Sequence, residues 1–345
     1  MQIHLGLGIL QWHPPEKLIR MVQLVEELGY EHFWHGNEKY YRDPWIGLAV
    51  AALNSKRLKL GTFIQDAYTL HPALTAVAIA TLDELSGGRA MLLMGAGGGG
   101  GQALAYVRRK PAVAIREAIQ VVRGMWAGER VQVEGQVVRF LGGRLGFAAR
   151  KDIPIYVASR GNLVLSMAGE VADGVMVATY ASPPGVQHAL ARIDRGLARS
   201  GRSRRDIALF SRIDTWIDPD PHVAREAVRK MVAGFLTTSF PDMGFVHAVG
   251  LELPQELQAV LAKKDREHSH EHAHLVPDEV VDAFTWTGTT EDVARRIAAV
   301  ARQGIPNITV LLHPPPGKDE FGAIRRLAEE VKPMVEEMTR DGVAL

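Results

Sequence analysis

The chain has no cysteine, which excludes disulfide bonds, thiolate metal sites and a cysteine nucleophile. It also has almost no net charge, because 40 basic side chains stand against 39 acidic ones, and no extended basic stripe suits nucleic acid. No run reaches the roughly 18 uninterrupted apolar residues of a membrane helix, and the first residues lack the pattern of a signal peptide. These absences predict a cytoplasmic protein that binds neither nucleic acid nor a membrane.

The chain does have a regular alternation of buried strands and amphipathic helices over its 345 residues, of which 47% are apolar. Its short apolar runs are typical of strands covered on both faces, and they predict strands at residues 3–7, 32–34, 58–64, 90–95, 153–158, 174–178, 207–217 and 307–312. Helices are predicted at residues 15–28, 44–53, 72–85, 112–126, 163–169, 185–198, 289–302 and 318–338. The alternation predicts a (β/α)8 TIM barrel in a single domain, residues 1–345. A doubly wound open sheet is the alternative, because spacing does not show whether the sheet closes.

Two segments depart from this rhythm. Residues 130–140, RVQVEGQVVRF, hold two alternating apolar runs around Glu134 and Gly135, which predicts a surface β-hairpin after the fourth helix. Residues 237–282 show neither period, so we expect an insertion before the last strand that covers the barrel mouth.

Five consecutive glycines follow the fourth strand, at the end of a strand where α/β proteins bind ligands. Gly97, Gly98 and Gly101 belong to this run, which adopts positive φ easily and lets phosphate approach bare backbone amides. A solvent loop without a ligand is the alternative interpretation.

A second candidate anion site follows the fifth strand. Ser159, Arg160, Gly161 and Asn162 open a helix there, and they offer backbone amides, a hydroxyl and a guanidinium to an anion. In the alternative, Ser159 or Asn162 only caps the helix and Arg160 is solvated. Two such loops predict a phosphate-bearing ligand.

Several motifs, in order along nearly the whole chain, resemble the luciferase-like family of flavin and deazaflavin oxidoreductases. They are TLDELSGGR at 81–89, MGAG at 94–97, REA at 116–118, WAGE at 126–129, AGE at 168–170, ADG at 172–174 and GTTEDV at 288–293. The resemblance implies a (β/α)8 barrel with an insertion, a dimer or larger homo-oligomer, and FMN or coenzyme F420 with its ring at the strand ends.

Within that family, Arg42 and the segment DAYTLHP at 66–72 resemble the F420-dependent methylenetetrahydromethanopterin reductase branch. This resemblance implies coenzyme F420 as a hydride carrier without oxygen activation, with FMN as the alternative cofactor. It also implies a non-proline cis peptide behind the ring, which matches Phe63 and Ile64 here.

The chain departs from the family at two acidic positions. Asn37 and Glu38 replace a frequent Asp-His pair, and Gly98 replaces a frequent glutamate. Glu38 is our candidate proton donor if burial raises its pKa, His35 is the alternative donor, and Asn37 is expected to contact the cofactor. Otherwise Glu38 forms an ion pair with Lys39 or Arg42.

Three functions fit these features. The first is an F420-dependent oxidoreductase that transfers a hydride to or from a small organic substrate. The second is an FMN-dependent monooxygenase, and the third is a cofactor-binding protein with little catalysis. No Gly-x-Gly-x-x-Gly fingerprint follows the first strand, which argues against a nicotinamide site.

Four alternate histidines lie in the expected insertion: His268, His270, His272 and His274. The spacing puts two of them on one face of a strand or helix, which fits a divalent metal. A polar excursion of the insertion is the simpler interpretation, and we predict no physiological metal site.

Overall fold

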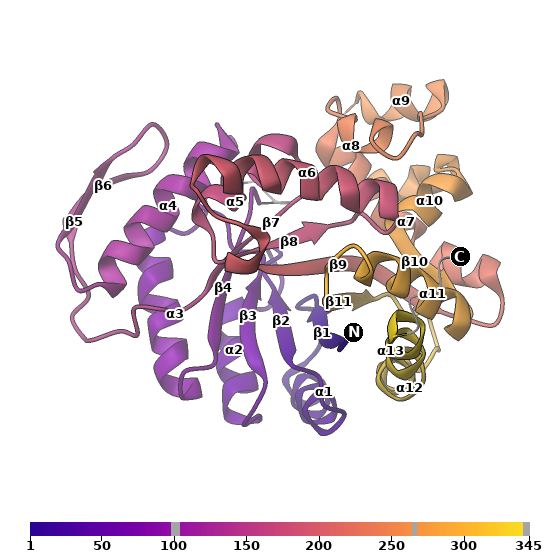
Figure 1. Ribbon diagram of the computed structural model, residues 1–345, viewed down its shortest axis with the longest axis horizontal. Helices are drawn as coiled ribbons and strands as arrows, with labels where there is room; N and C mark the ends of the chain where they lie inside the picture. The colour runs from indigo at the N-terminus through magenta and orange to yellow at the C-terminus, as the bar shows by residue number, and fades with distance from the viewer. Residues whose placement is uncertain (98–103, 264–267, 341–345) are drawn as a thin grey trace. The chain divides into compact units, whose positions relative to one another are not determined.

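The computed structural model describes residues 1–97, 104–263 and 268–340 (Figure 1). Within these ranges the barrel strands are β1 (His4–Ile9), β2 (His32–Gly36), β3 (Lys59–Phe63), β4 (Ala90–Met94), β7 (Ile155–Ser159), β8 (Gly174–Ala178), β9 (Ala208–Ile217) and β11 (Asn307–Leu312). They are ordered β9-β11-β1-β2-β3-β4-β7-β8, and β9 also pairs with β8, which closes the sheet. The predicted (β/α)8 barrel is therefore confirmed, and the open-sheet alternative is wrong.

One short strand was not predicted. Strand β10 (Thr285–Gly288) pairs in parallel with the end of β9, so that Thr285 lies opposite Asp214 and Gly288 opposite Ile217. Its sequence, TWTG, is too short to show a period, and it lies directly behind the expected insertion.

The structure divides into two compact units. The N-terminal unit comprises Leu7–Met176 and Arg192–Ala208, and the C-terminal unit comprises Met1–Gly6, Val177–Ala191 and the chain from Leu209 onward. The helices of the N-terminal unit include α1 (Pro15–Glu27), α2 (Pro44–Leu53), α3 (Pro72–Ser86), α4 (Pro111–Trp126) and α5 (Asn162–Val171). Figure 1 shows α1 to α4 side by side along the strands that precede them.

The predicted hairpin is confirmed as β5 (Val131–Glu134) and β6 (Arg139–Gly143), which are antiparallel and lie beyond α4 in Figure 1. Glu117 of α4 holds its turn, because the carboxylate accepts hydrogen bonds of 2.7 to 3.0 Å from the backbone amides of Gln136, Val137 and Val138. A Cβ at Gly135 would lie 2.3 Å from the Glu117 carboxyl carbon. The turn therefore needs glycine at this position.

Arg89, the last residue of the TLDELSGGR motif, has a structural role. Its guanidinium donates to the carbonyl oxygens of Ala52, Ser55, Leu58 and Ser86 at 2.7 to 3.0 Å. The carbonyls of Ala52, Ser55 and Ser86 lie at or just beyond the carboxyl ends of α2 and α3, where helical C=O groups lack intrahelical partners and attract a cation, and Leu58 directly precedes β3. One side chain thus joins the carboxyl ends of two neighbouring helices.

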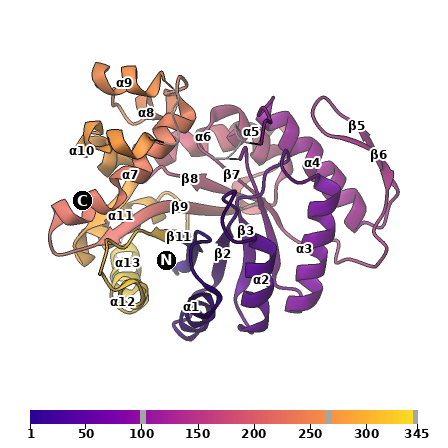
Figure 2. The same cartoon turned by 180° about the vertical axis from the view of Figure 1, so that it is seen from behind.

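The remaining helices are α6 (Pro183–Arg199), η1 (Arg204–Asp206), α7 (Pro221–Ser239), α8 (Gly244–His247), α9 (Gln255–Leu261), η2 (Ser269–Leu275), α10 (Asp278–Phe284), α11 (Thr290–Ala301), α12 (Glu320–Arg326), a π segment (Leu327–Val331) and α13 (Lys332–Arg340). A capping box opens α11, because Thr289 Oγ1 accepts from Asp292 N and the Asp292 carboxylate accepts from Thr289 N. The segment 237–282 begins inside α7 and is largely helical where it is described, and Figure 2 shows α8, α9 and α10 gathered near α7. That the segment 237–282 covers the barrel mouth stays a prediction.

None of the described helices combines the length and the apolar character needed to cross a membrane.

Candidate active site

The loops after β2, β3 and β4 are joined by backbone hydrogen bonds within the N-terminal unit. Asn37 N donates to Phe63 O at 3.1 Å, and Gln65 N donates to Leu93 O at 2.9 Å. Gly95 N donates to Gln65 O at 3.0 Å, so the strand pairing continues into the loops. These loops follow the carboxyl ends of the strands, which is the end where TIM barrels carry their active sites.

Side-chain amides tie the loops further. The Gln11 carboxamide, after β1, accepts from Glu38 N at 2.7 Å and donates to Glu38 O at 3.4 Å. Asn37 Nδ2 donates to Gln65 Oε1 at 2.7 Å. Neutral amide groups therefore connect the loops after β1, β2 and β3.

A buried ion pair completes this arrangement. Lys39 Nζ lies 3.0 Å from Asp66 Oδ2 and donates to Asn37 Oδ1 at 3.3 Å. Burial by itself would raise the pKa of Asp66, but the backbone hydrogen bonds from Thr69 and Tyr68 and the charge of Lys39 together lower it. Asp66 is thus ionised at neutral pH and neutralises Lys39. We call Gln11, Asn37, Lys39, Gln65 and Asp66 the loop network.

The peptide bond between Phe63 and Ile64 is cis, as predicted. Close contacts surround it: a Cβ at Gly8 would lie 2.7 Å from the Phe63 ring, and a Cβ at Gly95 would lie 2.8 Å from Ile64 Cγ2 and 3.1 Å from Ala158 O. Glycine on β1 and after β4 therefore makes room for the two residues of the cis peptide.

The beginning of the glycine run packs on the loop network. Gly97 has φ +76°, and a Cβ there would lie 3.0 Å from the Asp66 Cβ. Its carbonyl accepts a 2.8 Å hydrogen bond from Arg108. Gly98 and Gly101, the other predicted contacts of the run, lie outside the described residues.

The segment Ser159 to Asn162 does open helix α5, as predicted. Gly161 is the N-cap residue, and the Ser159 hydroxyl accepts from Gly161 N at 3.0 Å. No side chain caps the helix, so Ser159 and Asn162 do not play the capping role of the alternative interpretation. Arg160 is half-buried, which does not match a fully solvated guanidinium.

The two candidate proton donors differ in their surroundings. Glu38 is exposed, so the burial that its predicted role requires is not present in this structure. The alternative ion pairs are not formed, because Lys39 pairs with Asp66 and Arg42 donates to the carbonyls of Gln11 and Trp12. Among the described residues, the Glu38 carboxylate has no ion-pair partner.

His35 lies apart from the loop network. Its side chain is only 3% exposed, and a Cβ at Gly47 of α2 would lie 2.4 Å from its Nε2. Burial lowers the pKa of His35 to about 4, so the ring is neutral at pH 7. The structure therefore places His35 in the packing between β2 and α2.

The sequence did not single out Gln11, Lys39, Gln65 and Asp66 as site residues. Their signal was present, because each is a polar residue within three positions of the end of a strand. The contacts among these residues depend on the register of the strands. They also depend on the Gln11 side chain, which extends from the loop after β1 to Glu38 in the loop after β2. A single sequence does not contain that information.

A second charged cluster in the C-terminal unit was also not predicted. Asp214 of β9 accepts from Arg212 at 2.7 and 3.2 Å, and His313 Nε2 lies 2.7 Å from its Oδ1. Asp214 is only 1% exposed. Burial by itself would raise its pKa, but the Arg212 charge and the His313 hydrogen bond lower it to about 2.

The described part of the chain contains no group of three or more side chains able to hold a metal ion. His272 and His274 lie on η2, and His268 directly precedes it. The His274 ring is engaged with the Glu271 carbonyl at 3.0 Å.

Comparison with known proteins gives the class. The family model of luciferase-like monooxygenases matches residues 2–307. The chain therefore belongs to the luciferase-like monooxygenase family, as its motifs predicted.

Relatives and solved structures narrow the similarity. The 5,10-methylenetetrahydromethanopterin reductase of Methanolobus tindarius is 30% identical over 328 residues, which covers 94% of this chain and 98% of the relative. The enzyme of the same name from Archaeoglobus fulgidus is 31% identical and covers 90% and 93%. The structure of the coenzyme F420-dependent tetrahydromethanopterin reductase from Methanopyrus kandleri matches with a TM-score of 0.83 at 28% identity, over 96% of this chain and 99% of the other.

The buried cluster around Asp214 gives a pH prediction. The pKa of Asp214 in the folded protein, about 2, lies below its pKa in the unfolded chain. The carboxylate therefore stabilises the fold above about pH 4. This contribution, on the order of 2 kcal/mol, is lost as the pH falls towards 2. We expect Asp214→Asn to lower the free energy of unfolding at pH 7 and the difference from wild type to narrow by pH 3. Denaturant titrations at both pH values measure this.

Asp152→Asn is the control, because Asp152 has an 86% exposed side chain and should leave the unfolding free energy nearly unchanged. A difference between wild type and Asp214→Asn that stays constant from pH 7 to pH 3 would contradict the ionised state of Asp214.

Proposed function

We propose that the protein is a coenzyme F420-dependent oxidoreductase that transfers a hydride between the deazaflavin and a small organic substrate. The observation that carries the proposal is the loop network after β1, β2 and β3, together with Gly95 and Gly97, which leave open space beside Ile64 and Asp66. Relatives at 30% and 31% identity that are named methylenetetrahydromethanopterin reductases support it. The absence of a nucleic-acid partner remains part of the proposal, supported by the near-zero net charge. A cytoplasmic location also remains part of it, and a chain without cysteine fits a reducing compartment.

The residues present fit such a cofactor. Gly95 and Gly97 leave the space beside Ile64 and Asp66 that a larger residue would fill. Phe63 and Ile64 would support the ring from behind, and Asn37 would hold its edge. The amides of the glycine run and of Ser159 to Asn162, together with Arg160, would hold the phosphate-bearing tail.

When bound, the deazaflavin supplies a ring carbon that accepts or donates a hydride. The chain contributes position and electrostatics. Asp66 neutralises the charge of Lys39, so the loop network as a whole carries no net charge. Glu38 is exposed and lacks the burial expected for a donor, but we still assign the proton transfer to it, because its carboxyl group can exchange protons with water, Gln11 fixes its backbone on both sides and no cation in the described residues occupies its carboxylate. His35, packed against α2, is the less suitable donor.

Cofactor binding tests the proposal. We expect purified protein to bind F420 more tightly than FMN, and Gly97→Val to weaken F420 binding roughly tenfold or more, because the side chain meets Asp66 and the backbone is left-handed there. Fluorescence titration measures both affinities. Gly146→Val is the control, because no atom lies within 4 Å of a Cβ at Gly146.

Three results would overturn the proposal in different ways. Preference for FMN with oxygen consumption by the reduced flavin would favour the monooxygenase. Tight F420 binding without turnover of methylenetetrahydromethanopterin, secondary alcohols or activated alkenes would favour a cofactor-binding protein. Unchanged F420 affinity in Gly97→Val would remove the glycine run from the site.

The role of Glu38 has its own test. Glu38→Gln is expected to lower kcat by about 10²-fold, the usual worth of a general acid, while the dissociation constant for F420 stays the same. Steady-state kinetics with a substrate that turns over, together with F420 titration, separate the two effects. The control is Glu16→Gln, which changes an exposed carboxylate of α1. An equal kcat in Glu38→Gln and wild type would exclude Glu38 as the donor.

We further propose that a second copy of this chain covers α2 and α3. The solvent-facing side of α2 has no polar residue: Ile46 is 68% exposed, Leu53 is 71% exposed, and Trp45, Ala49 and Val50 are partly exposed. A helix that is apolar all round is normally buried. Helix α3 lies next to α2 in both Figure 1 and Figure 2 and adds exposed Leu74, Val77 and Leu85.

The exposed side of α2, which has no charged residue, suits its own copy across a twofold axis, because no like charges meet there. We expect the wild-type protein to be a homodimer and the double variant Ile46→Glu, Leu53→Glu to be a monomer. Light scattering during size-exclusion chromatography measures the mass. Leu163→Glu, at an 80% exposed position of α5, is the control that should stay dimeric. A monomeric wild type at micromolar concentration would refute the interface.

A further inference from the structure

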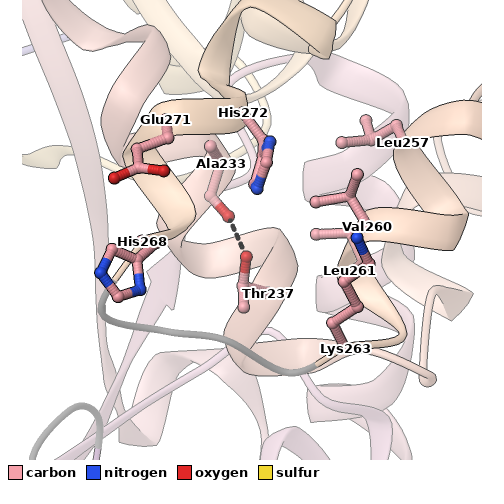
Figure 3. A pocket seen from close by; sticks show the side chains of 9 residues that line it. All are labelled: Ala233, Thr237, Leu257, Val260, Leu261, Lys263, His268, Glu271 and His272. Carbon is pink, nitrogen blue, oxygen red and sulfur yellow. Dashed lines mark hydrogen bonds between the residues drawn. The ribbon is translucent and has the colours of Figure 1, made fainter.

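A cavity of about 430 Å³ lies within the helical segment of the C-terminal unit (Figure 3). Helix α7 forms its floor through Ala233 and Thr237. The segment of α9 and the segment around η2 form two facing walls. Its volume falls in the range of small-molecule pockets in proteins.

The wall formed by α9 is apolar. Leu257 and Leu261 are four residues apart, so they lie on one face of the helix, and Val260 adds to the same lining. Both leucines are almost fully shielded from solvent. An apolar ligand group placed here would leave water without displacing any protein hydrogen bond.

The opposite wall is polar. His268 and His272 come from the η2 side, and Figure 3 shows His272 directed from η2 towards α9. Lys263, which follows α9, brings an ammonium group to the same space. The carboxylate of Glu271 lies on the His268 side of the cavity, away from α9. Among the described residues that line the cavity, the charged group near the apolar wall is therefore a cation, Lys263.

We propose that this cavity binds a small amphipathic carboxylate. The hydrocarbon tail lies against Leu257 and Leu261, and the carboxylate accepts hydrogen bonds from Lys263 and His272. In this arrangement the negative charge of the ligand lies beside the positive charge of Lys263, and its hydrocarbon tail contacts the apolar wall. None of these residues belongs to the loops of the proposed cofactor site, so the inference does not depend on F420 binding.

Calorimetric titration of the full-length protein with octanoate tests the proposal. For a probe of this size, we expect saturable binding with a dissociation constant on the order of 0.1 to 1 mM. Octylammonium, which has the same tail and the opposite charge, should bind markedly more weakly. Octanol, without a charge, should fall between them.

Two variants locate the site. Lys263→Glu reverses the charge at the head and should weaken octanoate while it strengthens octylammonium. Val260→Trp fills the cavity beside the leucines and should weaken all three probes. Lys230→Glu is the matched control, because Lys230 is exposed on α7 and does not line the cavity.

Any of three outcomes would overturn the inference. The first is an absence of saturable octanoate binding in the millimolar range. The second is equal binding of the three probes that neither variant changes, which would indicate non-specific adsorption. The third is an equal effect of Lys230→Glu and Lys263→Glu, which would reflect overall charge and not a local contact.

Discussion

Three backbone hydrogen bonds carry the pairing of β2, β3 and β4 past the ends of these strands, and the candidate site is built on them. The amide of Asn37 donates to the carbonyl of Phe63, and the amide of Gln65 donates to the carbonyl of Leu93. The amide of Gly95 in turn donates to the carbonyl of Gln65. Once these backbones are fixed, the side chains of Asn37 and Gln65 meet at 2.7 Å. The site is thus positioned by the sheet itself, and the loops have little freedom to move their polar groups independently.

This constraint explains the distribution of glycine. Adjacent loops that follow parallel strands are close enough for a Cβ to collide with the neighbour, as it would at Gly95 against Ile64 and at Gly97 against Asp66. The same logic holds at Gly8, beneath the Phe63 ring. Glycine serves here mainly to allow close approach, and only Gly97 of these three needs a positive φ. Flexibility is therefore not required to explain this part of the glycine-rich segment.

The fold was predictable from the sequence because each barrel strand is an apolar run and the helix that follows it is amphipathic or apolar. β10 and the short helices α8, α9 and α10 escaped prediction, because four to seven residues do not complete two periods. Helix α7 was not predicted either, although it spans 19 residues. In the site, polar residues after strands were visible but their partners were not. Lys39 was considered a partner for Glu38, yet it binds Asp66, which lies 27 positions further along the chain and reaches it through the β2–β3 pairing.

The charge balance of the loop network bears on what kind of chemistry these loops support. A buried lysine without a partner would cost several kcal/mol, and Asp66 removes that cost while its own pKa is kept low by the amides of Tyr68 and Thr69. The pair therefore has a structural role and is not available for proton transfer.

The other polar side chains of the loop network, Asn37, Gln11 and Gln65, are neutral amides. The exposed Glu38 carboxylate has a position fixed through its backbone and no cation bound among the described residues, whereas the Asp43 carboxylate caps α2. Under the proposed function, a hydride carrier needs little more than this from the protein, because an uncharged surface would hold its ring without favouring either charge state, and the Glu38 carboxyl group would exchange the proton that accompanies the hydride.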